Sequence, residues 1–268
     1  MSILKADEPI DSFIILGFDY LKRNDYEKAL LILTECIEQK LKGLHWAYFY
    51  RGLLFKLINK IDKAISDFLS STFTLPTFGL PYFELALIKL TDEKFDLNSV
   101  EFLLKKCIEY TPDFPFAYFE LGKIYIEKRN FFSAIEFFNK FLFYSGNYSM
   151  DFYWHRGLAF YYAGKFYLAE KDLVDCLYLA LNKNNFDLVT ECLLLLGDIA
   201  LKTRNLDKCI NLLSLLIDNN PKEFRAYFIR GLAFYELGDT DLSKRDLAIA
   251  CENGIDDAGV FLKKIMKN

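Results

Sequence analysis

Hydrophobic and polar residues alternate along this chain with the period of an α-helix, and the alternation is interrupted at regular intervals. Around Gly122, the apolar and aromatic residues Tyr118, Leu121 and Tyr125 follow one another at steps of three and four residues, which is the spacing of one helix face. A short polar turn follows at 128–130. The next helical stretch carries Ala134, Ile135, Phe138 and Phe141. This part of the sequence predicts two amphipathic helices joined by a tight turn.

The same helix-turn-helix pattern recurs along almost the whole chain with a period near 34 residues. The hexapeptide RGLAFY occurs at 156–161 and again at 230–235, and RGLLF at 51–55 is a near copy. A small residue marks the same place in seven units, at Gly17, Gly52, Ala86, Gly122, Gly157, Gly197 and Gly231. Four units place an alanine twelve residues later, at Ala29, Ala64, Ala134 and Ala169. Proline at 76, 112 and 221 marks the end of the second helix, because proline disfavours helix at the residue before it.

Seven units and one further helix account for the chain. We expect an N-terminal segment at 1–9 and units at about 10–43, 44–78, 79–112, 113–146, 147–181, 190–221 and 222–255. Residues 256–268 predict a helix that covers the apolar face of the last unit, as a repeat array requires. Surplus residues predict a longer turn near 92–98. A second surplus at 180–189 is either a hinge or a helix lengthened by one or two turns.

These repeated positions resemble the signature of the tetratricopeptide repeat family, which places an aromatic, Leu-Gly and an aromatic in the first helix of each unit. Its second helix carries Ala, an aromatic or Leu, and Ala, and a proline closes the unit. The fourth unit matches best, through Tyr118, Leu121, Gly122, Tyr125, Ala134, Phe138 and Phe141, although Gly146 replaces the proline. The second unit matches through Tyr48, Gly52, Phe55, Ala64, Phe68 and Pro76. The resemblance implies an all-α fold, a right-handed α-solenoid of about seven helical hairpins with a C-terminal capping helix.

The amino-acid composition argues against several classes of protein. The 268 residues are 53% hydrophobic and 26% charged, and so much apolar content excludes a disordered chain. The 37 Asp and Glu residues outnumber the 33 Lys and Arg residues, so the chain lacks the basic footprint of a nucleic-acid-binding protein. It has no apolar run of membrane-spanning length, and its first residues lack the pattern of a signal peptide. We therefore expect a cytoplasmic protein without membrane insertion.

Few residues suit catalysis or metal binding. The two histidines, His45 and His155, are too few for a multi-histidine metal site and make a catalytic triad hard to build. Metalloprotease and phosphate-loop motifs are absent. Four cysteines occupy repeat positions of small buried residues: Cys36, Cys107, Cys176 and Cys209. For Cys192 and Cys251, the spacing in the sequence offers no partner. We expect reduced thiols, no enzyme activity, no metal and no cofactor.

Charged residues occur together at two positions of the repeat. Three units carry an arginine directly before the glycine, and the same three carry an aspartate fifteen residues after it. The other four units carry apolar residues at both positions, once the longer turn of the third unit is allowed for. Because a buried arginine needs a carboxylate to offset its desolvation, the two positions should touch. We predict three structural ion pairs: Arg51–Asp67, Arg156–Asp172 and Arg230–Asp246.

In tetratricopeptide repeats the first helices of successive units line a concave face where ligands bind, and the resemblance maps such a face onto this chain. The implied groove residues are Trp46, Phe49, Leu53, Phe83, Phe116, Phe119, Lys123, Trp154, Tyr161, Asp198, Phe228 and Tyr235, with Lys202 and Arg225 as further polar groups. Most are apolar or aromatic, which suits an apolar peptide or the hydrophobic face of a helix. The alternative is that these aromatic residues replace Leu and Ala in the core.

The function we expect is a protein-protein interaction scaffold or adaptor that docks a peptide or helix of a partner in an apolar, aromatic-rich groove. One alternative is a chaperone that shields a hydrophobic partner segment. Another is a nucleic-acid-binding helical-repeat protein, which would need a basic stripe along the first helices. Chaperone-tail-binding repeats carry Lys and Asn where this chain has Ile14, Phe18, Phe49 and Glu84, so we expect no dicarboxylate clamp. The identity of the partner and the oligomeric state do not follow from the sequence.

Overall fold

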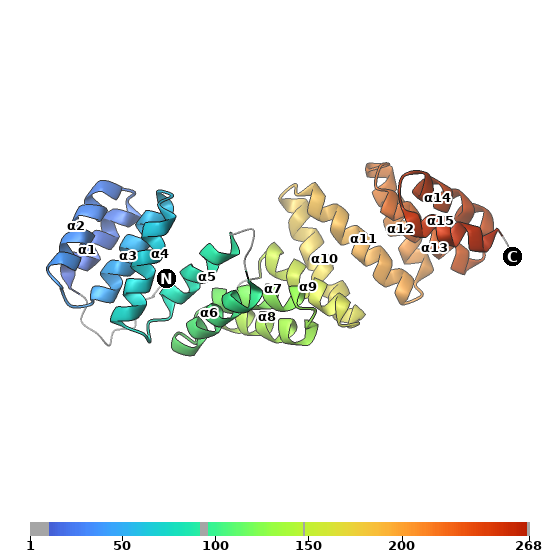
Figure 1. Cartoon of the computed structure of the whole chain (residues 1–268). Coiled ribbons are helices and arrows are strands. Elements are labelled where there is room, and N and C mark those ends of the chain that lie inside the picture. Colours follow the sequence, from blue (N-terminus) through green and yellow to red (C-terminus); the bar gives the residue numbers. More distant parts are fainter. Residues whose placement is uncertain (1–10, 92–95, 147, 267–268) are drawn as a thin grey trace. The chain divides into compact units, whose positions relative to one another are not determined.

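The protein consists of helical hairpins that follow one another along the chain (Figure 1). A computed structural model describes residues 11–91, 96–146 and 148–266. Every regular element in these ranges is an α-helix, which confirms the all-α solenoid predicted from the sequence. The helices form two compact units. The first unit contains α1 to α6 and most of α7, and the second contains most of α8 and all of α9 to α15.

The helices of each hairpin are similar in length. The first seven are α1 Ser12–Lys22, α2 Tyr26–Glu38, α3 Leu44–Leu57, α4 Ile61–Thr74, α5 Leu80–Leu90, α6 Leu97–Tyr110 and α7 Pro115–Glu127. The other eight are α8 Phe131–Ser145, α9 Met150–Tyr162, α10 Phe166–Asn182, α11 Phe186–Lys202, α12 Leu206–Asn219, α13 Phe224–Leu237, α14 Thr240–Glu252 and α15 Asp256–Ile265. No helix in the described part of the chain is both long and apolar enough to cross a membrane.

Short turns with a left-handed residue join the two helices of a hairpin. Asn24 and Asn59 have φ angles of 60° and 57°, and Gly164 has φ 71°. Asparagine and glycine adopt this conformation at the least cost, which explains why they stand there. The residue after the turn caps the next helix in several hairpins, as Asp25 does by accepting a hydrogen bond from the amide of Lys28. Local sequence favours the turn in these hairpins, whereas Arg129 and Arg204 adopt the same conformation in the fourth and sixth hairpins.

The glycine that recurs at the same place in most repeats lies where the two helices of a hairpin pack closely against each other. A Cβ atom built on Gly17 or Gly197 would lie 2.8 Å from the side chain of Leu33 or Leu213, respectively. At Gly52 the facing side chain is Phe68, whose ring carbon would lie 2.7 Å from such an atom. The absence of a side chain lets a large residue of the second helix pack directly against the backbone of the first. This packing explains the repeated small residue.

The three predicted ion pairs are present, and each is bidentate. The Nε and Nη2 atoms of Arg51 both donate to Asp67 at 2.8 Å. The shorter of the two bonds from Arg156 to Asp172 is 2.7 Å, and so is the shorter of those from Arg230 to Asp246. The aspartate side chains are at most 6% exposed. Charge-assisted hydrogen bonds of this geometry are strong. Because both groups are largely buried, removing one partner would leave the charge of the other uncompensated.

Each of these arginines also reaches the hairpin before its own. The Nη1 atom donates to Thr34 from Arg51, to Asn139 from Arg156 and to Ser214 from Arg230, at 3.3, 3.1 and 2.9 Å. Thr34, Asn139 and Ser214 all lie on the second helix of the preceding hairpin. The arginines therefore connect successive repeats as well as the two helices of one repeat, which the sequence analysis did not predict.

The surplus residues at 180–189 lie mainly in helices. Helices α10 and α11 have 17 residues each, and only Lys183–Asn185 join them. In the third hairpin α5 ends at Leu90 and α6 begins at Leu97. Residues 92–95 of the longer turn expected there lie outside the described residues, as does the N-terminal segment 1–9. The exact repeat boundaries and the hinge stay predictions.

The last helix packs on the end of the array. Ala258 and Ile265 of α15 are buried in a cluster with Leu247 and Ala250 of α14. Asp257, Lys263 and Lys264 of α15 are exposed, together with Val260. An amphipathic helix of this kind covers the apolar face that a terminal repeat would otherwise expose.

Candidate functional site

Four of the predicted groove residues are buried in the first unit. The side chains of Trp46, Phe49, Phe83 and Phe119 are only 6–9% exposed. The Trp46 ring lies 4.4 Å from that of Phe78, measured between ring centroids. Large rings fill the space between successive hairpins here. This is the core arrangement that the sequence left open as an alternative, and in this structure these four rings offer little surface to a partner.

The other predicted groove residues remain at least partly accessible. In the first unit, Phe116 is exposed, Leu53 is half-buried, and Lys123 forms an ion pair with Glu120 at 2.8 Å. In the second unit, Tyr235 packs edge-on against Phe261 with ring centroids 5.1 Å apart. Trp154, Tyr161, Asp198 and Phe228 are half-buried on α9, α11 and α13. The accessible part of the predicted set is therefore concentrated in the second unit.

Polar groups connect α9 to α11 on this face. The hydroxyl of Tyr161 donates a hydrogen bond to Asp198, and the Nζ atom of Lys202 donates to the same carboxylate at 2.6 Å. The pKa of Tyr161 is raised by burial and, next, by its hydrogen bond to Asp198. The ammonium of Lys202 also lies 5.7 Å from the centroid of the Tyr161 ring. This part of the face is a fixed polar network, in contrast to the apolar groove expected from the sequence.

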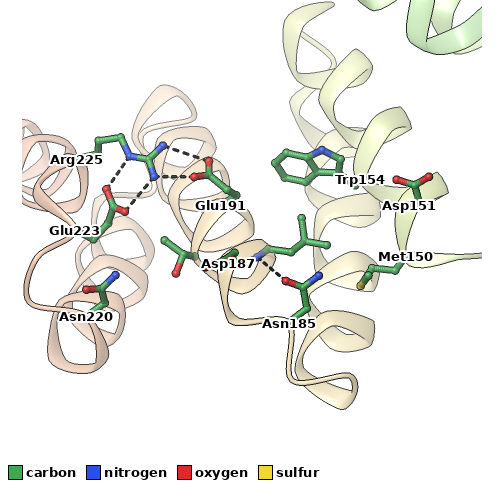
Figure 2. Close-up of a pocket in the computed structure, with 11 residues that line it drawn as sticks. Met150, Asp151, Trp154, Asn185, Asp187, Glu191, Asn220, Glu223 and Arg225 are labelled. Carbon is green, nitrogen blue, oxygen red and sulfur yellow. Dashed lines mark hydrogen bonds and ion pairs between the residues drawn. The ribbon is translucent and has the colours of Figure 1, made fainter. Parts of the chain in front are cut away.

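A pocket of about 620 Å³ opens among the N-terminal ends of α9, α11 and α13, all within the second unit (Figure 2). Its lining residues are Met150, Asp151, Trp154, Asn185, Asp187, Leu188, Thr190, Glu191, Asn220, Glu223 and Arg225. The first turns of three helices meet here, and Asn185 caps α11 by accepting a hydrogen bond from the amide of Leu188 at 3.2 Å. The pocket therefore has a preformed backbone frame.

Arg225 is held in place by two glutamates. Its Nη2 atom lies 2.7 Å from Glu191, and its Nε atom lies 2.7 Å from Glu223. The carboxylates of Glu223 and Glu191 raise the pKa of the Arg225 guanidinium, so it stays charged. The bond to Glu191 joins α13 to α11 across the pocket wall (Figure 2).

The remaining charges in the pocket are negative. Asp151 lies in the first turn of α9, where its Oδ1 atom is 3.2 Å from the Nδ1 atom of His155. Asp187 lies in the first turn of α11 and is exposed. With four carboxylates and a single cation, the lining carries a formal net charge of −3. The half-buried indole of Trp154 lies on the α9 wall, facing α11 (Figure 2).

Trp154 and Arg225 were predicted from the sequence, but the acidic residues around them were not. A signal was available, because Asp151, Glu191 and Arg225 all lie six residues before the glycine of their repeat. Trp46 and Phe116 of the predicted groove occupy the same position in their repeats, so the mapping could have been extended to it in every unit. No metal site is formed by this cluster: among the described residues, no group of three or more His, Cys, Asp or Glu side chains is placed to hold a metal ion.

Two cysteines that seemed unrelated in the sequence are neighbours. Cys176 on α10 and Cys192 on α11 are both fully buried, and each thiol lies close enough to the other to shift its pKa. This contact lowers the pKa of Cys176 and raises that of Cys192. Both cysteines are free, and their proximity was not evident from their spacing in the sequence. The fifteen residues between them include the turn at 183–185, which folds α11 back onto α10.

We expect the folded protein to have one thiol that reacts readily with Ellman's reagent at pH 8, out of six. Cys251 is exposed and the other five cysteines are buried, and thiolates are the reactive species. Burial raises the pKa of Cys36 to about 11 and that of Cys107 and Cys209 to about 12, from 9.0. The measurement is the count of fast-reacting thiols before and after denaturation, with C251S as the control that should show none.

The same shifts predict that the stability of the fold declines in alkali. Above pH 9 the unfolded chain releases these protons, whereas the folded chain keeps them until about pH 11–12. Stability falls with rising pH wherever the folded state binds more protons. The contribution is therefore complete below pH 9 and is lost between about pH 9 and 12. Urea unfolding at pH 8 and pH 10 checks this sign.

Family models and solved structures agree on the nature of the repeat. Models of the tetratricopeptide repeat (TPR) match residues 117–142 and 194–250. The chain contains tetratricopeptide repeats. TPR proteins are in general scaffolds, and their stacked repeats form extended surfaces for binding proteins or peptides. No curated protein matches the sequence.

Several solved structures share the fold of this chain at low sequence identity. YrrB, described as a TPR protein with an unusual peptide-binding site, is 18% identical with a TM-score of 0.62, over 74% of this chain and 97% of its own. MamA is 23% identical with a TM-score of 0.57, over 69% of this chain and 96% of its own. A TPR protein from Parabacteroides merdae is 14% identical with a TM-score of 0.51, over 95% of this chain and 97% of its own.

Proposed function

We propose that this TPR protein is an interaction scaffold whose second unit docks an extended peptide segment of a partner on the face formed by α9, α11 and α13. The pocket among the first turns of these helices carries the proposal. Pockets of this size bind small ligands or a few side chains, and a half-buried tryptophan is a frequent anchor in interfaces. YrrB, which has a similar fold, is described as having a peptide-binding site.

The chemistry of the pocket favours an extended peptide over the apolar helix expected from the sequence. A helix docking by its hydrophobic face needs a continuous apolar groove. Trp46, Phe49, Phe83 and Phe119 are buried, and the accessible face carries Glu191, Asp198 and other charged groups. The same observation argues against a chaperone that shields hydrophobic segments. The acidic lining argues against nucleic acid, whose phosphates require cations.

Position-specific photo-crosslinking tests this proposal. A benzoylphenylalanine at Leu188, on the pocket wall, should crosslink a partner in cells, and W154A should abolish that product. The same crosslinker at Val174, which is exposed on α10 outside the pocket, is the matched control. Identical products from both positions, or products at Leu188 that persist in a W154A variant with native circular dichroism, would refute docking in the pocket.

A further inference from the structure

We infer that the partner segment is basic, and that one of its lysine or arginine side chains lies between the indole of Trp154 and the carboxylates of α11. This inference rests on the proposed docking function and names the chemistry of its partner. Three observations support it: the negative charge of the pocket lining, the lack of a cationic or aromatic neighbour at the Trp154 ring among the described residues, and the way the pocket already binds the guanidinium of Arg225.

The pocket concentrates negative charge. The formal net charge of its lining is −3, almost as large as the −4 of the whole chain of 268 residues. Among the described residues, Asp187 forms no ion pair or side-chain hydrogen bond, and it is exposed. A cluster of one sign in a concave site attracts ligands of the opposite sign and repels those of its own. An acidic segment or a chain-terminal carboxylate would meet this repulsion.

The indole of Trp154 is available for a cation. Several other aromatic rings of the first helices already lie near basic groups of this chain. Lys123 lies 5.5 Å from the Phe119 ring, and the guanidinium of Arg156 lies 4.6 Å from the Phe152 ring. Trp154 has no aromatic or cationic neighbour of this kind within the described part of the chain. Tryptophan is the best aromatic partner of a cation, so this vacant ring is an independent reason to expect a basic side chain.

Arg225 shows how the pocket binds a guanidinium. Glu191 and Glu223 hold it with bonds of 2.7 Å from two directions. Asp187 and Asp151 repeat the same acidic chemistry on the neighbouring turns of α11 and α9. A second basic group, from the partner, would find a carboxylate on one side and the Trp154 ring on the other. Because Arg225 neutralises part of the lining, it also limits the affinity for that group.

The test uses the full chain and three acetylated, amidated octapeptides that differ at two positions: GARALRAG, GAQALQAG and GAEALEAG. Intrinsic fluorescence reports the contact with Trp154, since the second tryptophan, Trp46, is buried. We expect only the arginine peptide to bind, with an affinity that falls as salt is raised. D187N and E191Q should each weaken binding about five-fold, and R225A should strengthen it several-fold because it removes the competing cation.

A charge-matched control separates this site from general attraction to an acidic protein. Asp241 is exposed in the first turn of α14 and outside the pocket, so D241N makes the same change in net charge and should leave binding unaffected. Equal weakening by D241N and D187N overturns the inference. If the glutamine or glutamate peptide binds as tightly, the basic partner is wrong while docking in the pocket stands. If Leu188 also crosslinks no partner, docking itself fails.

Discussion

Replacing Asp172 by alanine is expected to destabilise the second unit by about 3–5 kcal/mol. The Asp172 side chain is 3% exposed and accepts bonds of 2.7 and 2.9 Å from Arg156, whose own side chain is 15% exposed. Without the carboxylate, a guanidinium would remain in a site from which water is largely excluded. The loss arises mainly from that uncompensated charge, because the net contribution of an ordinary hydrogen bond is only about 1 kcal/mol. Urea unfolding followed by circular dichroism measures it.

The control is the double variant R156L/D172L, which should recover most of the lost stability. The repeat at Gly197 already has leucine at both equivalent positions, Leu196 and Leu212, and well-packed apolar pairs often replace buried ion pairs without loss. N139A, which removes only the bond from Arg156 to the preceding hairpin, should cost about 1 kcal/mol. A loss below 1 kcal/mol in D172A, or a double variant as unstable as D172A, would contradict this account of the pair.

The second large effect is expected at Phe68, where alanine should cost about 3–5 kcal/mol in the first unit. The ring is fully buried, lies against the backbone of Gly52 and has its centroid 5.9 Å from that of Phe49. Removing it leaves a cavity that the helices α3 and α4 cannot close, because the surrounding side chains are held by other contacts. The loss therefore includes both the transfer of the ring to water and the unfilled volume.

F68L is the matched control, since Leu33 and Leu213 occupy the same position in their hairpins and face Gly17 and Gly197. A leucine at 68 should cost no more than about 1.5 kcal/mol. Thermal unfolding followed by circular dichroism compares the two variants. If F68A and F68L lose equal stability, the ring is not filling the space opposite Gly52 as described.

Features that depend on residues within one hairpin could be predicted from the sequence. The recurring glycine and the large residue that packs against it lie sixteen residues apart, as at Gly17 and Leu33. The ion pairs have the same separation. Two helices and a three-residue turn place such positions opposite each other whatever surrounds them. Correlated residue types therefore revealed the contact, as the charged pair Arg230 and Asp246 did.

Features that depend on how hairpins stack could not be predicted in this way. Whether Trp46 or Trp154 is exposed follows from the side chains that neighbouring hairpins place against it, and both lie on first helices. The bonds from the arginines to Thr34, Asn139 and Ser214 are of this kind as well. No repeated residue type marks these partners, because any short polar side chain can accept the bond.

The sequence by itself determined the helical repeat, the hairpin turns, the buried small residues and the three ion pairs. These depend on periodicity and on pairs of residues close in the chain, which a single hairpin brings together. Only the tertiary structure decided which aromatic residues of the first helices form the core and which line a pocket. It also brought Asp151, Glu191 and Arg225 together from three different repeats. The reason is physical: burial and electrostatic environment are set by all neighbouring hairpins at once, and no local pattern contains them.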